Sequence, residues 1–157
     1  MQDAQFIQIL FSVLVLVFSV VAHEVSHGFM AQHLGDPTAR LAGRLTMNPL
    51  RHIDPVGSLL VPLVTSLLPG GIVFGWAKPV PYNPYNLRDQ KWGDAKVALA
   101  GPLANLGIAV LFAMILRFGG GAMAPSMESI MHLIVFINII LAVFNLVPIP
   151  PLDGSKV

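Results

Sequence analysis

The chain contains no cysteine and has few charged residues. With no cysteine among 157 residues, disulfides, thiolate metal sites and cysteine nucleophiles are excluded, and the redox compartment stays undetermined. Charged residues make up 11% of the chain, against about 25% in a typical soluble domain. Hydrophobic residues make up 55%, and the mean hydropathy is +0.73. The composition therefore predicts a membrane protein that is surrounded by a lipid bilayer.

The charge balance argues against a nucleic-acid-binding protein, and the N-terminus argues against a cleaved signal peptide. The formal net charge is +1, so no nucleic-acid partner is predicted. The first five residues lack the basic stretch of a signal peptide, and no small-residue cleavage site precedes His23. We therefore expect the first apolar run to be retained. Without repeats or low-complexity tracts, residues 1–157 are predicted to form a single membrane domain, with no indication of its oligomeric state.

Four apolar segments are separated by polar, proline-rich stretches. The first (5–34), third (96–118) and fourth (129–147) are long enough to cross a bilayer, which takes about 20 residues. The second (56–74) is broken by Pro62, Pro69 and two glycines, which favours a re-entrant or broken apolar hairpin. Residues 38–55 are expected to form extended chain or short strands near the cytoplasmic interface. The predicted fold is an all-α polytopic membrane protein with three spanning helices.

A zinc-protease motif, His23-Glu24-Val25-Ser26-His27, lies toward the end of the first apolar segment. On a helix, His23 and His27 share one face, which lets two imidazoles bind one zinc ion. Glu24 is then placed to act as general base on a metal-bound water and to pass the proton to the leaving amine. Ionisable side chains are costly in lipid and call for a functional reason. The alternative is a chance match, or polar residues where a helix end meets the headgroups.

A third zinc ligand is required, because hydrolytic zinc usually takes three from the protein. We predict Asp153, which follows the proline-broken end of the fourth segment; its other role would be that of a turn residue, since Asp-Gly is a common turn pair. His52 and Asp54 are alternative ligands on the same side. For Asp153 to reach the His pair, the fourth segment must end on the side where the first ends. The second segment must then enter the membrane and return.

The basic residues agree with this topology. Arg117 alone is predicted on the far side, and the other eight of the nine basic residues fall on the side of the motif. By the positive-inside rule that side is cytoplasmic. We therefore expect a multi-pass protein of the cell membrane whose active site lies nearer the cytoplasmic face. The eight residues are Arg40, Arg44, Arg51, Lys78, Arg88, Lys91, Lys96 and Lys156.

Asparagine side chains supply the remaining polar groups of the spanning segments. Asn105 is the one strongly polar residue of the third segment. It is a candidate catalytic residue, which would bind the substrate backbone or stabilise an oxyanion. The equal alternative is a hydrogen bond between helices, the common role of asparagine in membrane proteins. Asn138 and Asn145 in the fourth segment are assigned to that second role.

Together these motifs resemble the site-2 protease family of intramembrane zinc metalloproteases, over nearly the whole chain. The resemblance rests on the zinc motif, on Asn48 to Pro55, on Ala77-Lys78-Pro79-Val80-Pro81, on Ala100 to Asn105, and on Asn145 to Gly154. It implies zinc bound by His23, His27 and Asp153, with Glu24 as the catalytic residue. It also implies cleavage of transmembrane protein substrates near the cytoplasmic face, commonly after a first cut by another protease.

One departure and one rival accompany this resemblance. Relatives usually continue into a further helix, whereas this chain stops four residues after Asp153, so we expect a metalloprotease core that is truncated at its C-terminus. The rival is a membrane zinc-binding protein or transporter without hydrolysis. Such a protein needs the three metal ligands but not Glu24.

Overall fold

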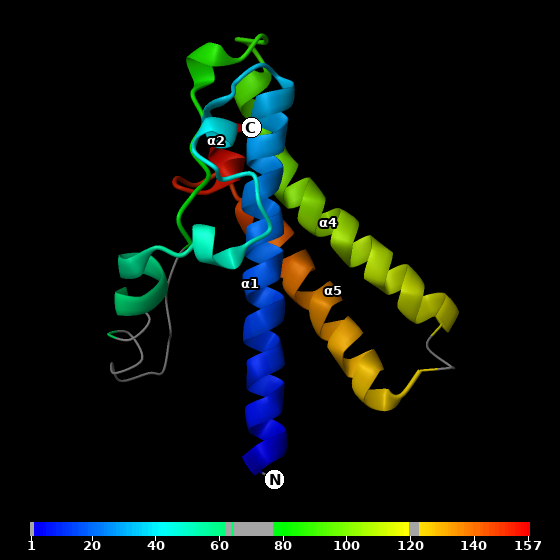
Figure 1. The fold of residues 1–157 in the computed structure, drawn as a ribbon. Coiled ribbons are helices and arrows are strands. Elements are labelled where there is room, and N and C mark those ends of the chain that lie inside the picture. The colour runs from blue at the N-terminus through cyan, green and yellow to red at the C-terminus, as the bar shows by residue number, and fades with distance from the viewer. Residues whose placement is uncertain (1, 62–63, 65–76, 120–122) are drawn as a thin grey trace.

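Three long helices dominate the computed structural model, which describes residues 2–61, 64, 77–119 and 123–157 (Figure 1). They are α1 (Gln2–His33), α4 (Gly93–Gly119) and α5 (Pro125–Asn145). Each contains a stretch long and apolar enough to cross a membrane, beginning at Ile9 in α1. The prediction of an all-α protein with three potential membrane spans is therefore confirmed.

Short helical turns lie between α1 and α4 and after α5, and no strand occurs in the part of the chain that the structure describes. Within residues 38–55, all of which the structure describes, the chain forms α2 (Thr38–Leu41) and the 3₁₀ turn η1 (Pro49–Arg51). The prediction of short strands in this stretch was wrong. Further turns are the π-helical η2 (Pro55–Leu60), the 3₁₀ turn η3 (Pro84–Asn86) and the 3₁₀ turn η5 (Asp153–Lys156).

The physical reason for these turns is a repeated dipeptide in which Asn or Asp precedes proline. Asn48, Asp54 and Asn83 each accept backbone N–H groups at the start of the turn that follows. Proline takes the first helical position, where its missing N–H costs nothing and its fixed φ suits a helix. These pairs are therefore helix-start signals, and they outweigh the extended preference of a punctuated polar segment.

Glycines end α1 and α2 in the same way. Gly35 and Gly43 adopt φ values of 110° and 63°. After α1, the Asp36 N–H bonds the Ala31 carbonyl and the Gly35 N–H bonds the Gln32 carbonyl. This is the Schellman pattern, which needs a left-handed residue that glycine adopts without steric cost. The chain therefore turns sharply back alongside α1, which brings the following loop close to the zinc-protease motif.

The loop after α1 is held by one buried carboxylate. Asp36 is fully buried and accepts hydrogen bonds from Thr38, from the Asn83 backbone N–H (2.7 Å) and from the Asn86 amide (2.8 Å). Burial alone raises the pKa of Asp36, but these hydrogen bonds outweigh it and hold the pKa below its usual range. The ionised side chain thereby fastens residues 83–86 to the end of α1.

Helix α4 packs against both α1 and α5, and α5 returns toward the middle of α1 (Figure 1). Turn η5 follows α5 and contacts α4. Most of the predicted re-entrant segment, residues 56–74, lies outside the described residues. Its flanks are adjacent, since the Lys78 N–H bonds the His52 carbonyl at 2.9 Å. The chain after α5 thus reaches the part of α1 that carries the zinc-protease motif.

Candidate metal centre

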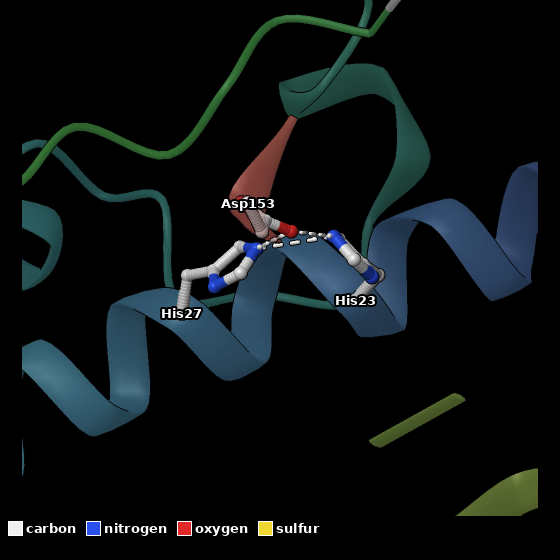
Figure 2. A group of neighbouring side chains, drawn as sticks. All are labelled: His23, His27 and Asp153. Carbon is white, nitrogen blue, oxygen red and sulfur yellow. Dashed lines mark hydrogen bonds and ion pairs between the residues drawn. The ribbon is translucent and has the colours of Figure 1, made fainter. Parts of the chain in front are cut away.

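Three side chains from opposite ends of the sequence converge on one point (Figure 2). Helix α1 supplies His23 and His27, and η5 supplies Asp153. Asp153 Oδ2 lies 3.0 Å from His23 Nε2 and 3.2 Å from His27 Nε2, and the two Nε2 atoms are 3.1 Å apart. Both imidazoles are buried, and the Asp153 side chain is 18% exposed. Among the described residues this is the one cluster of His, Asp or Glu suited to hold a metal ion.

The spacing of these atoms fits a zinc ion. With ligand bonds of about 2.0–2.1 Å, tetrahedral zinc separates its ligand atoms by roughly 3.3 Å, close to the three separations in the cluster. Two imidazole nitrogens and one carboxylate oxygen are a usual donor set for catalytic zinc. Burial raises the pKa of Asp153, but the His23 and His27 side chains beside it lower that pKa well below its usual range. The carboxylate is therefore ionised, as a metal ligand must be.

Helix α4 orients both imidazoles through contacts with their Nδ1 atoms. His23 Nδ1 lies 2.6 Å from Asn105 Oδ1, and His27 Nδ1 lies 2.7 Å from the Val97 carbonyl oxygen. A ring N–H that donates to an oxygen leaves the other nitrogen free to bind metal. Val97 and Asn105 are two turns apart on α4, so one face of this helix meets one face of α1. Both Nε2 atoms consequently point toward Asp153.

A glycine permits this close contact between the two helices. Gly101 lies midway between Val97 and Asn105, and it is buried. A Cβ atom at this position would lie 2.5 Å from His27 Nε2 and 2.6 Å from His23 Nε2. Such distances are shorter than any real contact, so only glycine lets α4 approach the two ring nitrogens.

Glu24 lies on the other side of the motif and is held by an extended segment. Its Oε2 accepts the Val80 backbone N–H at 2.9 Å. This segment, residues 78–81, approaches α1 closely at Gly28, where a Cβ atom would come within 2.8 Å of Val80 Cγ1. Arg44 anchors the segment by donating to the carbonyl oxygens of Lys78 (2.6 Å) and Pro79 (3.3 Å). A backbone N–H group thus holds the Glu24 carboxylate in place beside the two histidines.

The cluster and Glu24 line one cavity of about 180 Å³. The motif, the extended segment and the start of α4 form most of its wall. Near its edge, Lys156 donates to the Tyr82 hydroxyl at 3.1 Å and stacks over that ring. A small polar cavity with a candidate metal site and an adjacent carboxylate suits hydrolysis of a short stretch of backbone. The lining residues are His23, Glu24, His27, Pro79, Val80, Tyr82, Val97, Ala98, Asn145, Pro151, Asp153 and Lys156.

The other predicted candidates are not among the three clustered side chains. His52 is buried with Nε2 beside the Thr46 carbonyl oxygen, and Asp54 caps η2. Neither joins the candidate metal group. Asn105 is completely buried behind His23, with its amide nitrogen bonded to Asn138 and to Ser19.

Sequence reasoning missed several contributors to the cavity, among them Val80 and Asn145. Val80 acts through its backbone N–H, and a backbone donor leaves no signal in residue type. Asn145, which the sequence assigned to helix packing, lines the cavity and also donates to the Leu141 carbonyl within α5. Asn145 is the last residue of α5, so it lies where this helix gives way to the chain that carries Asp153. A polar residue directly before a proline-broken helix end was the available signal.

The sequence matches proteins whose names describe this chemistry. Residues 119–157 match the model of peptidase family M50. YwhC of Bacillus subtilis is 35% identical over 152 residues, which are 92% of this chain and 66% of that protein. MJ0611 of Methanocaldococcus jannaschii is 33% identical over 153 residues, which are 94% of this chain and 72% of that protein. Rip2 of Mycolicibacterium smegmatis is 37% identical over 139 residues, covering 88% and 52%.

All three relatives carry the name "Putative zinc metalloprotease". The chain spans between about half and two thirds of the length of YwhC and Rip2. No solved structure matches the chain. The zinc in these names agrees with the donor set that the fold assembles.

Proposed function

This chain belongs to peptidase family M50, a family of zinc metalloproteases, and from this premise we propose that it forms the membrane-embedded core of an intramembrane protease. The proposed substrate is a membrane protein, cut within or near a transmembrane helix. The observation that carries the proposal is the shared cavity, in which Glu24 faces the same space as His23, His27 and Asp153. A metal site without hydrolysis has no need of that carboxylate.

In this proposal the three clustered side chains hold zinc. Bound there, zinc would act as a Lewis acid, polarising the scissile carbonyl and making a water molecule more acidic. Glu24 would take the proton from that water and return it to the leaving nitrogen. The Val80 N–H bonds Glu24 Oε2 and leaves Oε1 available for the proton. Asn105 belongs to the site through its contact with His23.

The size of the cavity supports an unwound substrate. A helix with its side chains is about 10–12 Å across, which is too wide for a cavity of about 180 Å³. An amide inside a helix is also shielded by its own turns. The substrate helix must therefore unwind locally before its backbone reaches Glu24, and helix-breaking residues near the cut would lower the cost.

The charges support an orientation with the cavity nearer the cytoplasm. Arg117 lies in the last turn of α4, at the end away from the cluster, while eight other basic residues fall in the segments at the cluster end. The positive-inside rule then favours a cytoplasmic location for the cluster end.

The residues on either side of the predicted re-entrant segment lie next to each other, at His52 and Lys78. Their adjacency supports a path in which the segment between them enters the membrane and returns.

Replacing Glu24 by Gln tests the proposed function. Gln keeps an oxygen for the Val80 N–H but cannot take up a proton at neutral pH. We expect zinc content and fold to be kept and cleavage of a transmembrane model substrate to fall by at least ~10²–10⁴-fold, the usual contribution of a general base. The matched control is Glu128→Gln in the first turn of α5, which should cleave as the wild type does.

Two results would overturn the proposal. If Glu24→Gln cleaved at a near wild-type rate, the carboxylate would have no catalytic role. If that variant lost zinc or unfolded, Glu24 would be structural, and a non-hydrolytic membrane zinc-binding protein or transporter would be favoured. Metal analysis and a cleavage assay on the same purified sample in detergent separate the two.

A further inference from the structure

A chain of buried polar side chains runs from the candidate metal centre across all three long helices. His23 Nδ1 meets Asn105 Oδ1 at 2.6 Å, and Asn105 Nδ2 meets Asn138 Oδ1 at 2.7 Å. Asn138 Nδ2 in turn donates to Ser19 Oγ at 2.9 Å. Both asparagines are 0% exposed, and Ser19 and His23 are 5% and 6% exposed. Each polar group here must therefore find its partner within the protein.

Two backbone carbonyls decide which way the asparagine amides point. Asn105 lies 3.3 Å from the Ser19 carbonyl oxygen, and Asn138 lies 2.9 Å from the Ile134 carbonyl oxygen. A carbonyl can only accept, so the group that faces it in each case must be the NH₂. Rotating either amide by half a turn would set oxygen against oxygen in a fully buried site. The orientation of both amides is thus fixed by atoms whose chemistry is unambiguous.

This orientation determines the protonation of His23. With its NH₂ directed at Ser19 and Asn138, Asn105 presents its oxygen to His23 Nδ1. An oxygen acceptor requires a hydrogen on that ring nitrogen, so the neutral ring carries its proton on Nδ1. The lone pair then lies on Nε2, the atom that faces Asp153 and His27. The Val97 carbonyl sets the same state for His27.

We propose that Asn105 and Asn138 are positioning residues that fix the Nδ1–H state of His23 and so aim its Nε2 at the metal. The inference rests on the proposed function in taking His23 as a zinc ligand. It adds a role for Asn138, which touches neither the cavity nor a predicted ligand. It also accounts for polar side chains in the middle of α4 and α5, where each is costly unless fully paired.

The two histidines depend on different kinds of acceptor. His27 uses a backbone carbonyl, which no substitution at Val97 removes. His23 uses a side chain, which is itself held by another side chain. The network can therefore be dismantled one step at a time, and the effect on zinc should decrease with distance from His23.

The first measurement is the protonation state of the ring. In protein labelled with ¹⁵N-histidine, nitrogen shifts report whether Nδ1 of His23 carries a proton, and His23→Gln assigns its signal among the five histidines. We expect a protonated Nδ1 in the wild type, both with zinc and without it. A neutral ring with its only proton on Nε2 would overturn the inference, whatever the variants do.

The second measurement is zinc affinity by competition with a chelator. Asn105→Leu removes the acceptor and should weaken zinc binding by about 10–100-fold, the usual cost of losing a second partner of a metal-bound histidine. Asn138→Leu should weaken it less. Asn105→Asp keeps an oxygen for His23 and should bind zinc within a few-fold of the wild type, although its unfolding temperature falls. Ser129→Ala, an exposed change on α5, is the control.

A purely structural role for the network predicts another pattern. The Asp and Leu variants at Asn105 would then lower the unfolding temperature alike and leave zinc affinity and the ring signals unchanged, which would overturn the inference. Both measurements need no substrate. The inference can therefore fail while cleavage stands, and it can hold if Glu24→Gln shows that the protein does not hydrolyse peptides.

Discussion

The two halves of α1 differ in their surroundings. In the first half the large side chains are open, with Ile9 64% and Val13 51% exposed. In the second half Val21 and Val25 are 2% and 4% exposed, and Ala31 is fully buried. Helix α4 contacts the second half at His23 and His27, and α2 and the extended segment approach it at Gly28.

The polar side chains of α1 that serve the site lie where other parts of the protein cover the helix. Ser19, His23 and His27 all lie in the enclosed half and are buried there. In a bilayer the outer surface must be apolar, so the protein interior is where polar groups can find partners. A spanning helix therefore carries its chemistry where other elements cover it, and its lipid-facing half needs only to be apolar.

The largest expected effect comes from removing the ligand that joins the enclosed half to η5. Asp153→Ala should abolish stoichiometric zinc, a greater loss than the ~10–100-fold expected for an outer partner, because two imidazoles alone leave the ion without its anionic ligand. Metal analysis after dialysis measures it. Asp54→Ala should keep zinc. Wild-type zinc content in Asp153→Ala would instead direct attention to His52 or Asp54.

A smaller effect is expected from a methyl group placed where α4 meets α1. Gly101→Ala would put Cβ 2.5 Å from His27 Nε2, so α4 must move away and the Asn105 contact with His23 must stretch. Overpacking of this kind costs about 1–3 kcal/mol, and we expect weaker zinc binding with a lower unfolding temperature.

Gly107→Ala, two turns further along α4, is the matched control. Nothing lies within 4 Å of a Cβ atom there, and alanine favours a helix by up to about 1 kcal/mol over glycine. Its zinc affinity should match the wild type. Equal behaviour of the two variants would mean that the close approach at Gly101 is unimportant.

The smallest effect is expected when valine is replaced by alanine in each half of α1, which compares the two halves directly. Val25→Ala removes buried methyl groups and should lower the free energy of unfolding by about 1–3 kcal/mol. Val13→Ala changes a side chain that faces outward and should stay within ~0.5 kcal/mol of the wild type. Unfolding of both variants in the same detergent decides. A Val13 effect as large as that of Val25 would show that the first half is also packed against protein.

Much of the site could be predicted because two of its residues are close in sequence and because ionisable side chains are rare in apolar segments. His23 and His27 are one helical turn apart, and ionisable groups are rare in lipid, so the motif stands out in the sequence. Asp153 required a topological argument, and the structure brings it to the same point. The strands predicted at residues 38–55 failed because Asn48-Pro49 and Asp54-Pro55 act as helix-start signals, a local rule that the prediction did not apply.

By itself the sequence determined the membrane class, three apolar helices and the pairing of His23 with His27, since each follows from composition or from spacing within one helix. Only the tertiary structure decided that Gly101 lets α4 reach both imidazoles, that the Val80 N–H holds Glu24, and that Asn105 stands behind His23. These contacts join residues 56 to 82 positions apart, and a backbone N–H or a missing side chain carries no residue-type signal. Chain packing therefore had to supply what neither pattern nor composition could.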